Sequence, residues 1–319
     1  MSGTIVRFTL RVPAPFELRL AALSHGWFDL PPFRWDEERG ALGVALDLGP
    51  AGRALPADVA IAQRRDGALQ VELRTARRPL PAQIERARRA VGSMLRLDQD
   101  LRAFWALCAR DVRLRWAAAR GAGRLLRGAS VFEDLLKLLF TTNCSWAATR
   151  KMTERTVAAL GERTPSGART FPSPARCAEQ PESFWRTEVR AGYRAAACAA
   201  LADAFAAGRL ADAWFTDPEV PADELRRRLR AIRGFGPYAA GQAMRLLGHY
   251  EDLALDSWCR ARFAALRGRK TPPSDLAIAR EYRAFGAFAG LALWLDLTRS
   301  WHEPPARAAA DPVFRPAGA

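Results

Sequence analysis

The residues best suited to do chemistry together are a glycine turn and a carboxylate that follows it. The turn, Gly234-Phe235-Gly236, joins a basic amphipathic helix expected from Arg226 to an apolar helix that Pro237 opens. The free backbone N–H groups of such a turn and the positive end of the second helix both attract a phosphate anion. The apolar run 253–255 then brings Asp256 to the start of a third helix. A carboxylate fixed beyond a phosphate grip can lie beside the sugar that carries the phosphate.

The first 75 residues have the alternating pattern of antiparallel strands. Apolar and polar residues alternate over 6–12 and 42–48, and again over 69–73 after a turn signal at Asp66. An aromatic cluster over 25–35 interrupts the alternation and has two interpretations. It is either an exposed surface for nucleic acid or a set of rings packed against a neighbouring helix, and the sequence favours packing.

The pattern becomes helical from Pro79 onward. Helices are expected over 81–96, over 101–116 and from 132, with a break of small polar residues at 141–146. A further helix is expected over 286–293. The sequence therefore predicts an α+β fold with an N-terminal antiparallel β domain over 1–80, a mostly α-helical body over 81–302 and a flexible tail over 303–319.

Charge and composition restrict the partners. The chain has 319 residues, enough for a large buried core, and its formal net charge of +15 favours a polyanionic partner, either nucleic acid or an anionic membrane surface. No apolar run is long enough to span a membrane and the N-terminus is unlike a signal peptide, so we expect an intracellular, cytoplasmic protein. The 5 cysteines and 3 histidines are too scattered for a disulfide framework or a zinc site.

The block 226–263, which contains the glycine turn and Asp256, resembles the helix-hairpin-helix superfamily of base-excision DNA glycosylases. The similarity extends, in order, over segments that resemble the 8-oxoguanine branch of that superfamily, and these are Arg96-Leu97-Asp98, 132–146, Gly192-Tyr193-Arg194-Ala195 and 282–296. An N-terminal antiparallel sheet is typical of both the 8-oxoguanine and the alkyladenine branches. The resemblance implies a monomeric DNA-repair enzyme that acts on double-stranded DNA containing a damaged base, at the nucleoid.

The resemblance makes Asp256 the catalytic carboxylate. Base excision requires the nucleotide to rotate out of the duplex, and cleavage of its C1′–N bond develops positive charge on the sugar. An ionised carboxylate near C1′ can stabilise that charge and orient the attacking water. Asp256 is also expected to be the N-cap of a helix that begins at Ser257, and capping is one way to position it.

Relatives that also cut the DNA backbone use a lysine in the second helix of the hairpin, and here that position is Tyr238. A phenol cannot form a Schiff base, and the lysines, at 137, 151 and 270, are far from this helix in sequence. We therefore expect a monofunctional enzyme in which water is the nucleophile. Tyr238 either stacks on the extruded base or packs inside the helix pair.

The other residues expected in the base pocket are Gln242, Trp258, Leu293 and Leu297. Leu293 stands where the 8-oxoguanine branch has a glutamine that reads the purine edge, and Trp258 stands where that branch has a histidine that contacts a phosphate. A pocket without those polar groups would select by shape and stacking, which favours an alkylated base such as 3-methyladenine. Gln242 is left as a possible reader of the base edge.

The resemblance also implies contacts with DNA. Asn143, in the polar break, matches an asparagine that contacts the orphaned partner base, although it could equally cap the following helix. Arg233 and the turn Gly234-Phe235-Gly236 are expected to bind DNA, and the carbonyls of the turn could hold a monovalent cation, as in relatives. No iron–sulfur cluster is expected, because no group of closely spaced cysteines follows Cys259, and neither is any other cofactor or metal.

Two other functions are compatible with this sequence. The first is an 8-oxoguanine glycosylase with lyase activity, which would recruit Lys137 or another amine. The second is a binding protein that uses the hairpin only as a phosphate anchor. Such a protein needs neither a carboxylate at 256 nor an inserting loop at 141–146, so these two features favour an enzyme.

Overall fold

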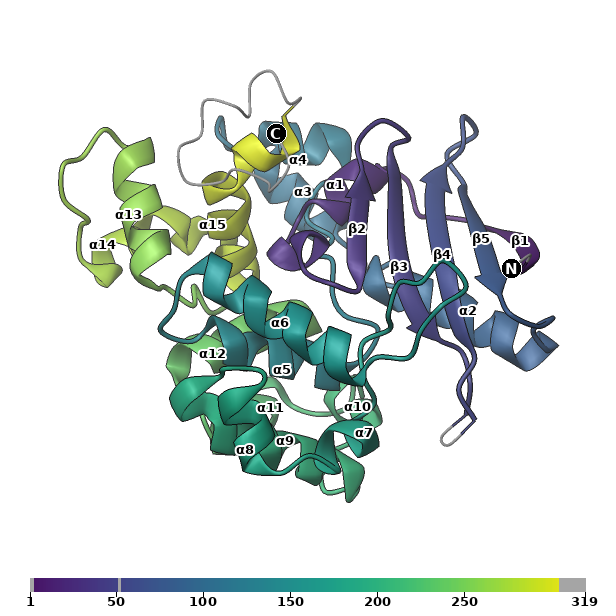
Figure 1. The fold of residues 1–319 in the computed structure, drawn as a ribbon. Helices are drawn as coiled ribbons and strands as arrows, with labels where there is room; N and C mark the ends of the chain where they lie inside the picture. Colours follow the sequence, from purple (N-terminus) through teal and green to yellow (C-terminus); the bar gives the residue numbers. More distant parts are fainter. Residues whose placement is uncertain (1–2, 51–52, 304–319) are drawn as a thin grey trace.

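The computed structural model describes residues 3–50 and 53–303. These residues form an N-terminal antiparallel sheet followed by a mainly helical part, which confirms the predicted α+β class (Figure 1). Within them, no helix combines the length and the apolar character that crossing a membrane requires. The predicted tail lies almost entirely outside the described residues, which end at Glu303.

The described part of the chain contains one sheet of five strands in the order β1-β5-β4-β3-β2, with antiparallel pairing throughout. Its strands are β1 (Thr4–Leu10), β2 (Phe33–Asp36), β3 (Ala41–Asp47), β4 (Pro56–Gln63) and β5 (Leu69–Thr75). The strands expected from alternation are β1, β3 and β5. The sequence did not single out β4, and β2 falls within the aromatic cluster, where alternation is masked by neighbouring rings and prolines.

The remaining elements are helices. The α-helices are α1 (Leu18–Ala22), α2 (Pro81–Met94), α3 (Arg102–Cys108), α4 (Arg115–Arg120), α5 (Val131–Thr141), α6 (Trp146–Leu160), α7 (Pro174–Ala178), α8 (Glu182–Thr187), α9 (Ala195–Ala206), α10 (Asp212–Phe215), α11 (Ala222–Ala231), α12 (Pro237–Leu247), α13 (Ser257–Leu266), α14 (Asp275–Tyr282) and α15 (Ala289–Leu297). The 3₁₀ helices are η1 (Gly26–Asp29), η2 (Gly192–Arg194), η3 (Arg283–Phe288) and η4 (Arg299–His302).

Two helices predicted as continuous are interrupted. The expected helix over 101–116 is divided into α3 and α4, because the Asp111 side chain accepts a hydrogen bond from the backbone N–H of Arg113 at 2.8 Å and so competes with helical pairing. The expected helix over 286–293 begins three residues later as α15, because Gly286 has a φ of +53° that a helix cannot include.

The sheet and the helices share a core. One buried cluster continues from the sheet through α2, α5, α9 and α12, and a second surrounds α3, α13 and α15. The segment between β1 and β2, which contains α1 and η1, lies between the sheet and the helical part (Figure 1). It is fixed there by tryptophans, since the Trp27 indole donates to Asp134 of α5 at 2.7 Å and the Trp146 indole of α6 donates to Asp29 at 2.7 Å.

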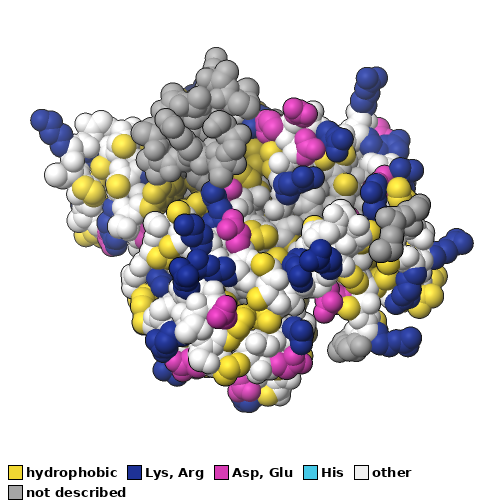
Figure 2. All heavy atoms as spheres, in the orientation of Figure 1, with side chains coloured by type: hydrophobic (Ala, Val, Ile, Leu, Met, Phe, Trp, Pro, Cys, Tyr) yellow, Lys and Arg dark blue, Asp and Glu magenta, His cyan; other side chains and the backbone are white. Residues whose placement is uncertain are grey.

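The surface is basic on both parts of the fold. Figure 2 shows Lys and Arg side chains over the sheet and over the helices, with acidic side chains between them. Arginines are dense on α11, which carries Arg226, Arg227, Arg228 and Arg230. This helix leads directly into the glycine turn.

The helix hairpin of α11 and α12 is built around Gly234, whose φ is +86°. A Cβ at this position would lie 2.9 Å from the Leu139 side chain and 3.1 Å from that of Ala197, so the turn packs closely on α5 and α9. Phe235 is buried and anchors the turn in the core. At Gly236 the backbone has a negative φ, and a Cβ would meet nothing within 4 Å. Gly234 therefore shapes the turn, and Gly236 keeps its outer surface open.

We predict that Gly234→Ala lowers the free energy of unfolding by about 1–2 kcal/mol, because alanine is strained at positive φ, with a further loss from the close contact with Leu139. Gly236→Ala is the matched control and is expected to change it by no more than about 0.5 kcal/mol. Urea denaturation of both variants measures the difference. Equal destabilisation by the two substitutions would contradict this description of the turn.

Candidate active site

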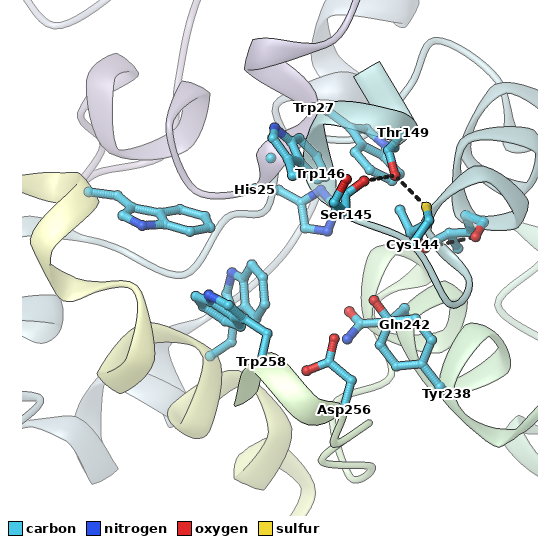
Figure 3. Close-up of a pocket in the computed structure, with 15 residues that line it drawn as sticks. His25, Trp27, Cys144, Ser145, Trp146, Thr149, Tyr238, Gln242, Asp256 and Trp258 are labelled. Carbon is cyan, nitrogen blue, oxygen red and sulfur yellow. Dashed lines mark hydrogen bonds between the residues drawn. The ribbon is translucent and has the colours of Figure 1, made fainter. Parts of the chain in front are cut away.

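A cavity of about 400 Å³ opens where the segment between β1 and β2 meets the helical part (Figure 3). Side chains from distant parts of the chain point into it, from the segment before β2, from the end of α5 and the start of α6, from α12, from the start of α13, and from the C-terminal helices. The lining residues are His25, Gly26, Trp27, Leu138, Thr141, Cys144, Ser145, Trp146, Thr149, Tyr238, Gln242, Asp256, Trp258, Trp294 and Trp301.

Five tryptophans line the cavity. The indole N–H groups of Trp27 and Trp146 are used in the bonds to Asp134 and Asp29, and that of Trp294 donates to the Ser24 carbonyl at 2.7 Å. Because their polar atoms are satisfied outside the cavity, these side chains present aromatic surface to it. A cavity of this size and character suits a flat, aromatic ligand.

Asp256 is the N-cap of α13, as the sequence predicts. Its Oδ1 accepts a hydrogen bond from the backbone N–H of Cys259 at 2.7 Å, and its carboxylate lies on the cavity wall (Figure 3). The carboxylate therefore lies at the positive end of the α13 dipole. Burial and the neighbouring Asp256 raise the pKa of the Cys259 thiol to about 12, so Cys259 stays protonated at neutral pH and is no nucleophile.

The chain between α12 and Asp256 is held by two side chains of α12. The Arg245 guanidinium donates to the Leu253 carbonyl at 2.7 Å and to Gln242 Oε1 at 3.0 Å, and Gln242 Nε2 donates to the Ala254 carbonyl at 3.3 Å. Ala254 has a φ of +46°, an uncommon conformation for alanine. The position of Asp256 is therefore set by contacts behind the cavity wall.

The cavity lining includes Tyr238 and no lysine among the described residues. Burial and the nearby Asp256 raise the pKa of Tyr238, which keeps it a neutral phenol. Lys137 is completely buried, with its Nζ 2.6 Å from Glu133 and among aromatic rings, so it is not available to attack a substrate in the cavity. The recruitment of Lys137 for lyase chemistry is excluded in this arrangement.

His25 lines the cavity, a position that no sequence pattern predicts. The aromatic cluster around it is packed, as the favoured interpretation has it, since His25 and Trp27 are both buried. The two roles are compatible, because His25 and Trp27 are buried by neighbouring residues and also line the cavity. Among the described residues, no group of three or more His, Cys, Asp and Glu side chains is arranged to hold a metal ion.

Comparisons of the sequence with known proteins found no match, whereas comparison of the structure with solved structures found clear similarity. No protein-family model matches the sequence, and no curated protein matches it. Among solved structures, the chain is similar to the 3-methyladenine DNA glycosylase of Archaeoglobus fulgidus, with 20% identity, a TM-score of 0.70, and coverage of 92% of this chain and 97% of that one.

Two further structures show the same similarity. The DNA-bound MBOgg1 has 18% identity and a TM-score of 0.69, covering 95% of this chain and 98% of that one. The apo 8-oxoguanine glycosylase/lyase of Clostridium acetobutylicum has 19% identity and a TM-score of 0.63, covering 93% and 99%. The chain has the fold of the helix-hairpin-helix DNA glycosylases. At identities of 18–20%, the similarity shows the fold alone.

Of the residues predicted for the base pocket of this fold, Tyr238, Gln242, Asp256 and Trp258 line the cavity together. The expectation for Leu293 and Leu297 requires correction. Both are completely buried in the core around α15 and neither lines the cavity, whereas Trp294 does. Successive residues of a helix differ by about 100° in direction, so a shift of one residue exchanges the two faces.

The residues predicted to bind DNA at the hairpin differ in exposure. Phe235 is buried in the core, so its side chain supports the turn from behind and is not available to contact DNA. Arg233 and Gly236 are exposed beside it. Contact of the exposed part of the hairpin with DNA stays a prediction.

The loop after α5 has an ordered shape. Ser145 caps α6 by accepting from the Ala148 N–H, so Asn143 is not the cap. Asn143 is exposed, has a φ of +47° and donates to the Tyr193 hydroxyl at 3.3 Å, while Arg194 donates to Thr142. Asn143 lies at the tip of this loop, outside the cavity lining, and its contact with a partner base stays a prediction.

The buried His25 leads to a prediction for stability. Burial and the positive charges of Arg245 and Lys137 lower the pKa of His25 from 6.5 to about 3. The unfolded chain binds a proton below pH 6.5 and the folded chain does not, so this contribution to stability is complete above pH 6.5 and is lost as the pH falls towards 3. Between pH 7 and pH 5 the loss amounts to about 2 kcal/mol.

We therefore expect His25→Phe to lose about 2 kcal/mol less unfolding free energy than the unmodified protein when both are moved from pH 7 to pH 5. Urea denaturation at the two pH values measures this difference. His25→Phe and the unmodified protein losing stability in parallel would show that His25 is protonated in the folded state.

Proposed function

We propose that the protein is a monofunctional DNA glycosylase of base excision repair, which extrudes a damaged purine from duplex DNA and hydrolyses its N-glycosidic bond. The observation that supports this most directly is the carboxylate of Asp256 on the wall of an aromatic cavity whose described lining contains no lysine. The similarity in fold to DNA glycosylases supports the same proposal, and the exposed part of the hairpin is available to bind the DNA backbone.

In the proposed mechanism, the extruded base enters between the tryptophan rings, and the hairpin and α11 bind the phosphates of the damaged strand. The carboxylate of Asp256, fixed through Oδ1, stabilises the positive charge that develops on the deoxyribose as the C1′–N bond breaks. It also orients the water that attacks C1′. The desolvated cavity strengthens this electrostatic interaction.

The absence of an amine from the described cavity lining supports hydrolysis without strand cleavage. A lyase forms a Schiff base between a lysine and C1′. Tyr238 stands at the family's lysine position and is held as a neutral phenol, and Lys137 is paired with Glu133 in the core. Water is then the nucleophile, and the product is an intact strand with an abasic site.

An alkylated purine such as 3-methyladenine is the substrate that the cavity wall favours. A methylated purine nucleoside carries positive charge, and such charge is attracted to the faces of aromatic rings. Trp27, Trp146, Trp258 and Trp294 provide those faces, and Tyr238 adds another. The similarity to the Archaeoglobus 3-methyladenine glycosylase is in accord with this choice.

The second candidate is an 8-oxoguanine glycosylase, because structures of this class have comparable TM-scores over comparable lengths of the chain. The resemblance to the 8-oxoguanine branch implies a glutamine on the last helix that reads the purine edge. This chain has Leu293 at that position, and Leu293 is buried in the core. A purely binding function is disfavoured, since it requires neither the cavity nor the carboxylate.

The proposal is tested with a panel of duplexes containing 3-methyladenine, 7-methylguanine, hypoxanthine or 8-oxoguanine. We expect release of a methylated purine, a strand that breaks only after alkali, and no covalent adduct after borohydride reduction. Release of 8-oxoguanine without an adduct would remove only the preference for alkylated bases. A borohydride-trapped adduct would contradict the monofunctional mechanism.

Asp256→Asn is predicted to reduce base release by about 10²–10³, equivalent to about 2.7–4 kcal/mol in the barrier, because the amide keeps the cap and removes the charge. Binding to lesion DNA should be retained. Single-turnover release of the free base measures the effect. A near-normal rate in this variant would revive the binding-protein alternative.

Gly236→Val is predicted to weaken binding to undamaged duplex DNA, since its side chain would occupy the open surface beside the N–H groups of the turn. Gly43→Val is the matched control, because Gly43 lies on β3 with only ordinary contacts for a Cβ. Fluorescence anisotropy over a range of salt concentrations measures affinity, which should fall steeply with salt for the unmodified protein. Equal affinities of the two variants would exclude the hairpin from the interface.

A further inference from the structure

His25 is a buried polar side chain without a described partner, and it faces the cavity. His25 is only 5% exposed, and its Nδ1 makes no hydrogen bond with a described residue. Figure 3 shows the ring facing the same open space as Gln242, Asp256 and Trp258, from the opposite side. Nδ1 has almost no accessible surface, so a ligand in the cavity reaches the ring through the edge that carries Nε2, which makes no hydrogen bond with a described residue. A ligand that hydrogen-bonds Nε2 then takes the place of water at a largely buried polar group.

The ring is held in one orientation. Trp27 packs edge-on against it at a centroid distance of 4.4 Å, and Trp294 packs against it at 5.6 Å. The preceding residue, Ser24, is also fixed, because its hydroxyl donates to the Ala21 carbonyl and accepts from the Leu126 N–H. His25 is thus a preorganised group, and the segment that carries it comes from the N-terminal part of the fold.

The ring is neutral at physiological pH, because burial and the charges of Arg245 and Lys137 lower its pKa to about 3. A neutral imidazole has one N–H donor and one acceptor nitrogen. On the opposite side of the cavity, the Gln242 amide is fixed in orientation by Arg245 and by the Ala254 carbonyl. The cavity therefore has two rigid polar groups within an aromatic wall.

We propose that His25 hydrogen-bonds the edge of the extruded base and, together with Gln242, determines which purine the cavity accepts. This inference rests on the proposed glycosylase function. The aromatic wall binds any flat purine, whereas a fixed donor and acceptor distinguish the amino edge of an adenine derivative from the carbonyl edge of a guanine derivative. His25 is then a specificity-determining residue, supplied by the segment between β1 and β2 of the N-terminal sheet.

The test compares two free bases of the same alkylation type, 3-methyladenine and 3-methylguanine. Each is titrated into the protein, and binding is followed by quenching of tryptophan fluorescence, since five tryptophans line the cavity. The variants are His25→Phe, which keeps an aromatic ring, and His25→Leu, which keeps only apolar bulk. His302→Phe is the control, because His302 is also buried, with unpartnered nitrogens and a pKa lowered to about 3, and lies outside the cavity lining.

We expect the ratio of the two dissociation constants to change by about tenfold in both His25 variants and to be unchanged in His302→Phe. A change smaller than about threefold in the His25 variants overturns the inference, as does failure of both bases to bind the unmodified protein. Release of the same bases from methylated DNA is measured in parallel. A ratio that depends on His25 in a protein that releases neither base would support the inference and contradict the proposed function.

Discussion

The hydrogen bonds from Arg245 and Gln242 to the chain after α12 decide where the carboxylate lies. Arg245 is 1% exposed, and it donates to the Leu253 carbonyl while also holding Gln242. Burial lowers the pKa of its guanidinium, and the nearby Asp252 and Asp256 oppose this shift only in part. Because both side chains come from α12, the helix that begins at the glycine turn also holds the segment that ends at Asp256. The glycine turn and the carboxylate are therefore parts of one rigid unit, and their separation is set before any ligand binds.

The cavity depends on a second constraint, the docking of the segment between β1 and β2 on α5 and α6. Trp27 and Trp146 make this contact through buried hydrogen bonds to Asp134 and Asp29. Gly26 allows the close approach, since a Cβ there would lie 2.5 Å from the Trp146 ring. The N-terminal sheet thus contributes to the site by presenting His25 and Trp27. An isolated helical part would lack that wall.

Sequence patterns located the turn, the carboxylate and its role as N-cap, because each depends on local chemistry that a few residues specify. Alternation found β1, β3 and β5 for the same reason. Patterns failed where tertiary packing decides. Leu293 and Trp294 are adjacent and both apolar, and only the packing of α15 determines that Trp294 faces the cavity. His25 lies far in sequence from Gln242 and Asp256, so no spacing rule could join them.

We propose that the Asp256 carboxylate faces the sugar cation formed during base release. This proposal is tested most directly with duplex DNA in which one sugar is replaced by a pyrrolidine, whose protonated nitrogen imitates that cation, and with a matched duplex containing an uncharged tetrahydrofuran. The account predicts that the protein binds the pyrrolidine duplex about a hundredfold more tightly, and that Asp256→Asn abolishes this preference. Equal affinity of the unmodified protein for the two duplexes would contradict it.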